Sequence, residues 1–299
     1  MSINTHDLKQ LAQQIALFKT QTVSALAKPQ QAFDIASLAS GYLATQQSGQ
    51  VAASNTTTGI SATSTINSIG RNLALPDPES AYQMMSYINQ LGVIYPAQSA
   101  RLSDMQTGVD ELAQAATSLS KIDATADFAS VKTQLQNLAD QYNQWRRNFD
   151  ADLQDPEILA STQAAQVARY ELAQSIASPF HGAQQGIQGM AVLGLTIDPV
   201  TNMAQLDTQK LSALWQQQPA AAAAAVSDFA SHFAHSATLL TEQNNFFAKQ
   251  QANLAKVINY MDSNKTKLQQ EFGLGDPPQV SAKLAQAFAD YQRRQQHTQ

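Results

Sequence analysis

The chain has 299 residues, no cysteine and a net charge of −5, which excludes disulfides, thiolate metal sites and a cysteine nucleophile. Charged residues make up only 14% of the sequence, against about 25% in typical soluble proteins, and polar uncharged residues take their place. The two basic pairs, Arg146-Arg147 and Arg293-Arg294, are far apart in the sequence. They form no basic stripe that would suit a phosphate backbone, so we expect no nucleic-acid partner.

No stretch approaches the roughly 18 consecutive apolar residues that cross a bilayer, so we expect no membrane insertion. The opening residues, MSINTHDLKQ, lack the basic and apolar regions of a secretory signal peptide. If the protein is exported, we expect it to leave the cell without a cleaved leader. Helices with glutamine- and alanine-rich surfaces have little charge repulsion. We therefore expect helical bundles and self-association.

The first region, residues 1–119, is predicted to be helical. Helices are expected over about 4–28, with a narrow apolar seam, and over about 30–44. Residues 46–68 contain too few apolar side chains to be ordered by burial, and we interpret them as a mobile loop. Asp77 is expected to cap a helix ending near Leu91, and a separate helix is expected to run from Pro96 to about Ile122.

Residues 120–185 are predicted to form a helical hairpin. Asp127 precedes an apolar seam with steps of three and four, which must be buried against another helix. Its members are Phe128, Val131, Leu135, Leu138, Tyr142, Trp145 and Phe149. The second helix of this hairpin is expected to begin at Pro156 and Glu157 and to end near Ser178.

Residues 186–218 are predicted to form a small β-hairpin followed by a helix. Leu193, Leu195 and Ile197 alternate with Gly194 and Thr196, which is typical of a short half-buried strand. The segment DPVTN at 198–202 is typical of a turn, and residues 203–206 can form the returning strand. An aspartate at 207 is then expected to cap the helix, which a proline at 219 ends.

The last region, residues 219–299, is predicted to hold one long coiled-coil helix to about Phe272 and a final helix from Val280 to about Gln296. Apolar residues recur every seven positions, which implies left-handed supercoiling. They are Val226, Phe233, Leu240, Phe247, Leu254, Met261 and Leu268. The second seam position is polar in the middle of this stretch, which indicates either a coil of specified register or an exposed surface for a partner. Overall, we predict a mainly α fold: an elongated antiparallel helical bundle or coiled coil with a small β-hairpin insert.

The sequence contains no convincing catalytic constellation, so we predict no enzymatic activity, no metal and no cofactor. Asp228, His232 and His235 share one helix face and could hold a metal ion, but that face points away from the apolar stripe, and we interpret them as solvated. Glycines at 182, 186 and 189 lack the lysine of a phosphate-binding loop, and we interpret them as a loose connection. The acidic residues Asp150, Asp152, Asp155 and Glu157 are interpreted as solvated capping groups.

Several short motifs occur in the order found in the C-terminal region of flagellar filament cap proteins, also called hook-associated protein 2. A helix ends in LADQYNQW, a following helix reads ARYELAQSIASP, and the segments LGLTID and AQLDTQKL come next. The matching positions are Tyr142, Asn143, Gly194, Leu206, Asp207, Lys210 and Leu211. The family's Asp-Gly before the second strand is replaced by Thr201-Asn202-Met203, and its β-rich domains are missing. The chain therefore resembles the helical leg of a cap protein.

This resemblance implies an exported, oligomeric structural protein of the bacterial flagellum, located outside the cell at a filament tip. The implied partners are further copies of the chain, flagellin or a hook-junction protein, and an export chaperone for the C-terminal helices. The alternative is a secreted helical-bundle protein that forms pores or acts on membranes, because such proteins are also long and cysteine-free.

Overall fold

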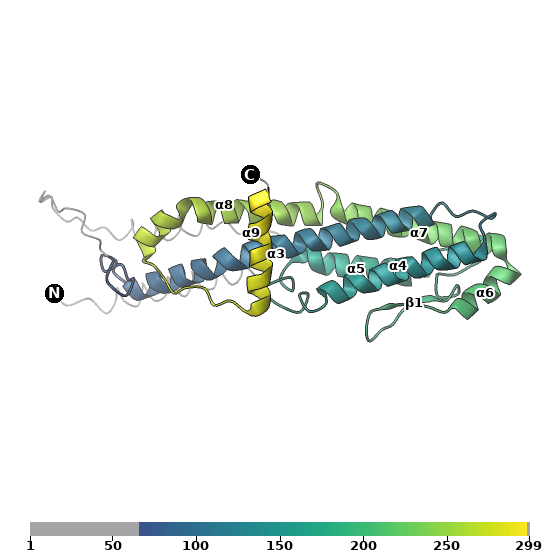
Figure 1. Ribbon diagram of the computed structural model, residues 1–299, viewed down its shortest axis with the longest axis horizontal. Coiled ribbons are helices and arrows are strands. Elements are labelled where there is room, and N and C mark those ends of the chain that lie inside the picture. Colours follow the sequence, from purple (N-terminus) through teal and green to yellow (C-terminus); the bar gives the residue numbers. More distant parts are fainter. Residues whose placement is uncertain (1–65, 298–299) are drawn as a thin grey trace, which may run out of the picture. The chain divides into compact units, whose positions relative to one another are not determined.

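The computed structural model describes residues 66–297, which form a mainly α fold with a small β-hairpin (Figure 1), as the sequence predicts. The helices expected over 4–28 and 30–44, and nearly all of the loop expected at 46–68, lie outside the described residues. The helices are α3 (Pro78–Leu119), α4 (Phe128–Phe149), α5 (Gln163–Ala177), α6 (Thr208–Gln217), α7 (Pro219–Thr241), α8 (Phe246–Phe272) and α9 (Ala282–His297). A 3₁₀ turn, η1 (Ala183–Gln185), precedes the antiparallel strands β1 (Leu195–Ile197) and β2 (Ala204–Leu206).

The described residues divide into two compact units, and helices α3 and α8 contribute to both. The smaller unit contains residues 66–89 and Ala255–Pro278. Within it, the Nδ2 group of Asn72 donates to the carbonyls of Gln270 and Glu271, each at 3.0 Å. These carbonyls belong to the last turn of α8 and have no partner within the helix. The side chain of Asn72 therefore caps the C-terminal end of α8.

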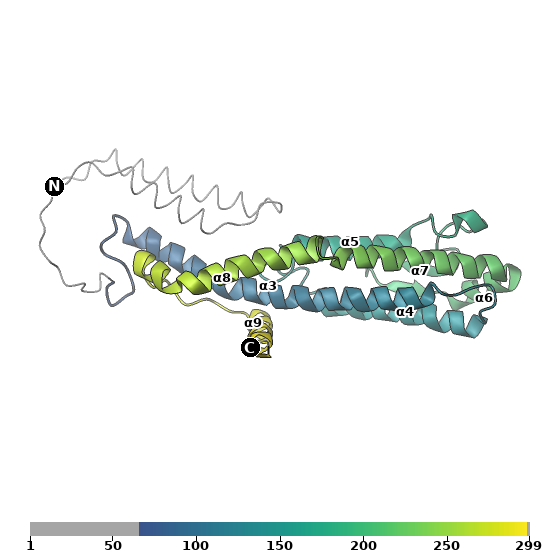
Figure 2. The same cartoon turned by 90° about the horizontal axis from the view of Figure 1, so that it is seen from above.

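The larger unit, Gln90–Leu254 with residues 279–297, is a helical bundle that carries the hairpin. Helix α5 packs along α7, the hairpin lies against α4 and α5, and α6 lies against α4 and α7 (Figures 1 and 2). The predicted seam of α4 is buried apart from Phe128, whose half-buried ring lies 6.0 Å from the ring of Trp215. The seam of α4 is thus the apolar core that the 3-4 spacing predicts.

Aspartates cap three helices, and the caps predicted at Asp77 and Asp207 are confirmed. Asp127 accepts a hydrogen bond from the backbone N–H of Ser130 at 2.9 Å, at the start of α4. Asp77 does the same for Ser80 at 3.0 Å, before α3. Asp207 accepts from two backbone N–H groups at the start of α6. Each carboxylate satisfies a donor that the first turn of a helix leaves free.

The predicted break at Pro96 is wrong, because α3 continues through it as one helix of 42 residues. A proline inside a helix removes a backbone hydrogen bond and costs about 3 kcal/mol. Here Val93 and Ala97, on either side of it, are buried against Leu284 and Ala287 of α9. Apolar packing on both sides of Pro96 offsets the lost hydrogen bond.

The predicted single helix from residue 219 to 272 is also wrong, because the chain leaves the helical conformation at residues 242–245, between α7 and α8. This segment reads Glu-Gln-Asn-Asn. The side chain of Asn245 donates to the carbonyl of Leu239 and accepts from the N–H of Phe246. Such local side-chain bonds compete with those of a helix. Leu240 and Phe247 are nevertheless both buried. The seven-residue repeat therefore predicts which side chains are buried, but it does not show that the helix is continuous.

The helix expected to begin at Pro156 begins instead at Gln163. Residues 150–162 form a series of turns, in which the carbonyl of Asp152 accepts from the N–H groups of Asp155 and Leu159, both at 3.1 Å. The carboxylate of Asp155 accepts from the N–H of Glu157 at 2.9 Å. These bonds occupy the groups that an earlier helix start would use.

Two glycines of α3 provide a test of close packing between α3 and α4. A Cβ atom on Gly108 would lie 2.6 Å from Cδ1 of Trp145, whereas a Cβ on Gly92 would meet nothing within 4 Å. We expect Gly108→Ala to lower the free energy of unfolding by about 1–3 kcal/mol through overpacking. Gly92→Ala should instead raise it by about 0.5–1 kcal/mol, because alanine loses less backbone entropy in a helix. Urea denaturation measures both; a stabilising Gly108→Ala would show that Trp145 does not lie against this helix.

Candidate functional site: the helix–hairpin junction

The side chain of Asn143 holds the second strand of the hairpin against α4. Its Oδ1 accepts a hydrogen bond from the backbone N–H of Ala204 at 2.7 Å, and its Nδ2 donates to the carbonyl of the same residue at 2.8 Å. The preceding residue, Tyr142, is fully buried and donates its hydroxyl to the carbonyl of Asn202 at 3.2 Å. Burial raises the pKa of Tyr142 to about 12, so the hydroxyl keeps its proton at neutral pH. The two neighbouring residues together fix the returning arm of the hairpin.

Gly194 and Asp207 form the base of the hairpin. The backbone N–H of Asp207 donates to the carbonyl of Gly194 at 2.9 Å. Gly194 has a φ of 91°, and a Cβ atom there would lie 2.4 Å from the carbonyl oxygen of Asp207. Glycine is required for both reasons. The carboxylate of Asp207 then accepts from the N–H groups of Gln209 and Lys210, at 3.0 and 3.1 Å, so the same residue closes the hairpin and begins α6.

The remaining motif positions differ in exposure. Leu211 is fully buried, Leu206 is half-buried and Lys210 is exposed. Tyr142 and Asn143 therefore bond the returning arm of the hairpin, Gly194 and Asp207 bond each other at its base, and Leu211 is the buried residue of α6. Sequence reasoning placed these residues on a shared motif, but the two hydrogen bonds of Asn143 to a strand 61 residues away have no signal in the local sequence.

The turn between the strands is organised by Asp198. Its Oδ1 accepts from the N–H groups of Val200 and Thr201 and from the hydroxyl of Thr201, at 3.0, 2.7 and 2.9 Å. The bonds from Thr201 and Val200 lower the pKa of this carboxyl. Asn202 completes the turn with a φ of 56°, a left-handed conformation that asparagine tolerates better than most residues.

All seven residues of the predicted coiled-coil seam are buried: Val226, Phe233, Leu240, Phe247, Leu254, Met261 and Leu268. They pack inside the chain, so the seam is not a free surface for another molecule. The polar seam position at Gln251 is bonded within the larger unit. Its Oε1 accepts from the hydroxyl of Ser99 at 2.7 Å, and its Nε2 donates to the carbonyl of Ser99 at 2.9 Å. The polar seam is interpreted from the sequence either as fixing the register of the coil or as an exposed surface for a partner. At Gln251 the bonds to Ser99 agree with a fixed register.

The histidines on α7 are exposed, in keeping with their interpretation as solvated residues. The ring of His232 lies 3.4 Å from a carboxylate oxygen of Asp228, while His235 is one turn further along. Across residues 66–297, no three histidine or acidic side chains are arranged to hold a metal ion.

The interpretation of the acidic residues near 150–157 as solvated is wrong for Asp152, which is buried. Its carboxylate forms an ion pair with Arg101 of α3, with an N–O distance of 2.6 Å. Arg101 also lies over the ring of Phe149 at 4.8 Å and donates to the carbonyl of Asn148 at 3.1 Å. Asp152 thus attaches the turns after α4 to α3.

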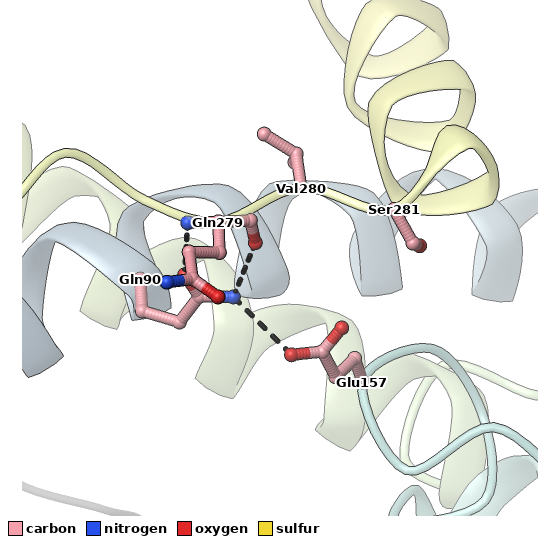
Figure 3. Close-up of a pocket in the computed structure, with 5 residues that line it drawn as sticks. All are labelled: Gln90, Glu157, Gln279, Val280 and Ser281. Atoms are coloured by element: carbon pink, nitrogen blue, oxygen red, sulfur yellow. Dashed lines mark hydrogen bonds between the residues drawn. The ribbon is translucent and has the colours of Figure 1, made fainter.

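An open pocket of about 460 Å³ lies beside the segment that leads to α9 (Figure 3). Gln90 and Glu157 face the backbone of residues 279–281 there. The Oε1 of Gln90 accepts from the N–H of Gln279 at 2.8 Å, and its Nε2 donates to the carbonyl of Gln279 at 2.9 Å and to Glu157 at 3.2 Å. Figure 3 shows these bonds joining the walls of the pocket. These bonds hold the segment that leads to α9 in place.

Arg146, one turn after Tyr142, is a feature that sequence reasoning missed. Its side chain is only 2% exposed. Nη2 donates to Asp150 at 2.8 Å, but Nε and Nη1 have no hydrogen-bond partner. A buried guanidinium with unsatisfied donors is destabilising. Its neighbour Arg147 is exposed, and no signal in the sequence separates the two arginines.

Comparisons with protein families, curated proteins and solved structures found no match to this chain. Between residues 66 and 297, none of the helices has both the length and the hydrophobicity to cross a membrane.

The Asn143 bonds can be tested by truncation. Asn143→Ala leaves the N–H and carbonyl of Ala204 without these partners, so we expect the free energy of unfolding to fall by about 1–3 kcal/mol. Asn137→Ala removes an exposed amide from the same helix and should change it by no more than about 0.5 kcal/mol. Urea denaturation compares the two variants, and hydrogen exchange at Ala204 reports the local effect. Equal stability of both variants would contradict the assignment.

Replacing Arg146 tests the energetic effect of its unsatisfied donors. The side chain of Asp150 is 45% exposed, so it remains solvated when its partner is removed. We therefore expect Arg146→Met to raise the free energy of unfolding by about 1–3 kcal/mol. Arg147→Met, on the exposed side of α4, is the matched control and should be nearly neutral. A loss of stability in thermal unfolding of Arg146→Met would refute the prediction.

Proposed function

We propose that this chain is a structural assembly protein of the hook-associated, filament-cap type, acting outside the cell as part of a bacterial flagellum. In this proposal it has no enzymatic role, self-associates, and contacts flagellin or a hook-junction protein. Binding of an export chaperone before secretion belongs to the same proposal.

The observation that carries the proposal is the junction of α4 with the hairpin. The motif residues come from two stretches about 50 residues apart, and four of them act on the same hairpin. Tyr142 and Asn143 bond its returning arm, and Gly194 and Asp207 bond each other at its base. Each has a specific physical task, either bonding a strand or permitting a close backbone approach. A set of residues with a shared structural purpose supports the resemblance better than separate short motifs do.

The one departure from the family pattern at the hairpin is compatible with the proposal. The family has Asp-Gly before the second strand, and the glycine readily adopts the left-handed backbone conformation that such a turn uses. Here Asn202 adopts that conformation, with a φ of 56°, and Asp198 supplies the side-chain bonds of the turn. The backbone path that a glycine would allow is therefore available to this sequence.

The proposed role depends on surfaces other than the seven-residue seam, because the seam is buried. The structure suits display of a hairpin on a stiff support, since the hairpin is bonded to α4 at Tyr142 and Asn143 and to α6 through Asp207. We therefore expect loss of the Asn143 bonds to impair assembly more than loss of an exposed amide does.

The test combines mass measurement with motility. In size-exclusion chromatography with light scattering, we expect a mass well above the 32.3 kDa of one chain. A deletion strain of the source organism should lose swimming, and the wild-type gene and Asn137→Ala should restore it better than Asn143→Ala. A strict monomer together with normal swimming of the deletion strain would overturn the proposal. Dye release from liposomes by the purified protein would instead favour the membrane-active alternative.

A further inference from the structure

The segment after α5, residues 178–190, forms a compact loop against α7, which we name the His181 loop. Gly182 has a φ of 72°, and a Cβ atom on it would lie 2.6 Å from the Cβ of Ala225. Its backbone N–H donates to Oδ2 of Asp228 at 3.0 Å. Inside the loop, the N–H of Gly189 donates to the carbonyl of His181 at 2.9 Å. The sequence suggested a loose glycine-rich connection, but these contacts attach the loop closely to the helix.

The ring of His181 is buried between α5 and α7. Its Nε2 lies 2.7 Å from the carbonyl of Ser175, and because a carbonyl only accepts, Nε2 must carry the hydrogen. The ring packs edge-on against Phe229 at a centroid distance of 5.4 Å. A neutral imidazole with its proton on Nε2 satisfies this environment.

A second histidine lies directly beside it. The ring centroids of His181 and His232 are 5.6 Å apart, and His232 is exposed. The side-chain charges that act on His181 both come from α7, namely His232 and Asp228, while α5 contributes the Ser175 carbonyl. Asp228 contacts His232 with one oxygen and the N–H of Gly182 with the other. The loop, the two rings and the carboxylate therefore form one cluster.

We propose that His181, packed beside His232, acts as a pH-sensitive latch, which holds the His181 loop on α7 while the buried ring is neutral and releases it when that ring takes up a proton. A protonated His181 ring would lie against the apolar ring of Phe229 and beside a second imidazole. Release would uncover Ile187 and Met190, which are buried. It would also free the segment leading to β1, because the carbonyl of Met190 accepts from the N–H of Leu195 at 3.0 Å.

The direction of the pH effect follows from the environment of His181. Burial lowers its pKa, and His232 acts in the same direction, whereas the Ser175 carbonyl and Asp228 oppose the shift. In an open loop the ring returns to its ordinary pKa of about 6.5. As the pH falls, the open form therefore binds a proton first. The closed loop is fully favoured above about pH 6.5 and loses this advantage as the pH falls further.

Hydrogen–deuterium exchange on the full chain, corrected for the intrinsic pH dependence of exchange, tests the latch. Between about pH 7.5 and about pH 5.5, we expect protection at Gly182, Ile187 and Gly189 to fall roughly threefold or more. The amide of Ala204, held by Asn143, should keep its protection and serves as the internal reference. Unchanged protection in the His181 loop across this range would overturn the proposal.

Three glutamine variants separate the latch from general acid sensitivity. His181→Gln keeps an N–H for the Ser175 carbonyl but cannot titrate, so the acid response of the loop should disappear. His232→Gln removes the neighbouring imidazole, which lowers the pKa of His181, so the acid response of the loop should shrink. Because position 232 is exposed, this variant also provides a test if His181→Gln does not fold. His235→Gln, also exposed on α7, should respond like the wild type. An acid response in His181→Gln or His232→Gln as large as that of the wild type would contradict the latch. The inference is independent of the proposed assembly role.

Discussion

The fold depends on side-chain amides that bind the backbone of a distant segment. Asn143 both donates to and accepts from Ala204, Gln90 does the same with Gln279, and Gln251 bonds the hydroxyl and carbonyl of Ser99. An amide carries donors and an acceptor on one planar group, so it can satisfy a backbone N–H and carbonyl without burying a charge. Burying charges is expensive unless they are well paired. This explains how a chain with 14% charged residues fixes its segments in a defined register.

Apolar contacts bring the helices close together, and the hydrogen bonds of the side-chain amides fix how the helices are aligned along one another. Helix α7 presents alanines to its neighbours, and the backbone of Gly182 lies against Ala225. Alanine faces are smooth and tolerate sliding, so the apolar contacts alone specify alignment weakly. A directional hydrogen bond specifies alignment more strongly. The bonds between Gln251 of α8 and Ser99 of α3, for example, would be lost if these two helices slid by one residue. A polar residue in the seam thus limits the number of ways in which the helices pack.

Much of the secondary structure could be predicted from the sequence, because it depends on local signals. The caps at Asp127 and Asp207, the alternation around Leu195 and the burial of the Phe233 seam all depend on residues within a few positions. Two errors, the break at 242–245 and the late start of α5, come from local side-chain and turn bonds. Others occurred where distant contacts decide the outcome. Helix α3 continues through Pro96 because α9 packs on both sides of it. Likewise, the burial of Arg146 and the partner of Asn143 depend on segments that local patterns do not identify.

The position of the Asn143 bonds has a consequence for solubility. Ala204 lies opposite Ile197 in the hairpin, and its N–H and carbonyl point outward to Asn143 and not to the paired strand. Open strand edges are templates on which other chains add strands and aggregate. Here an amide from a helix takes the place that an incoming strand would occupy on this edge. The hairpin can therefore be presented at high local concentration without recruiting neighbouring chains into a growing sheet along this edge.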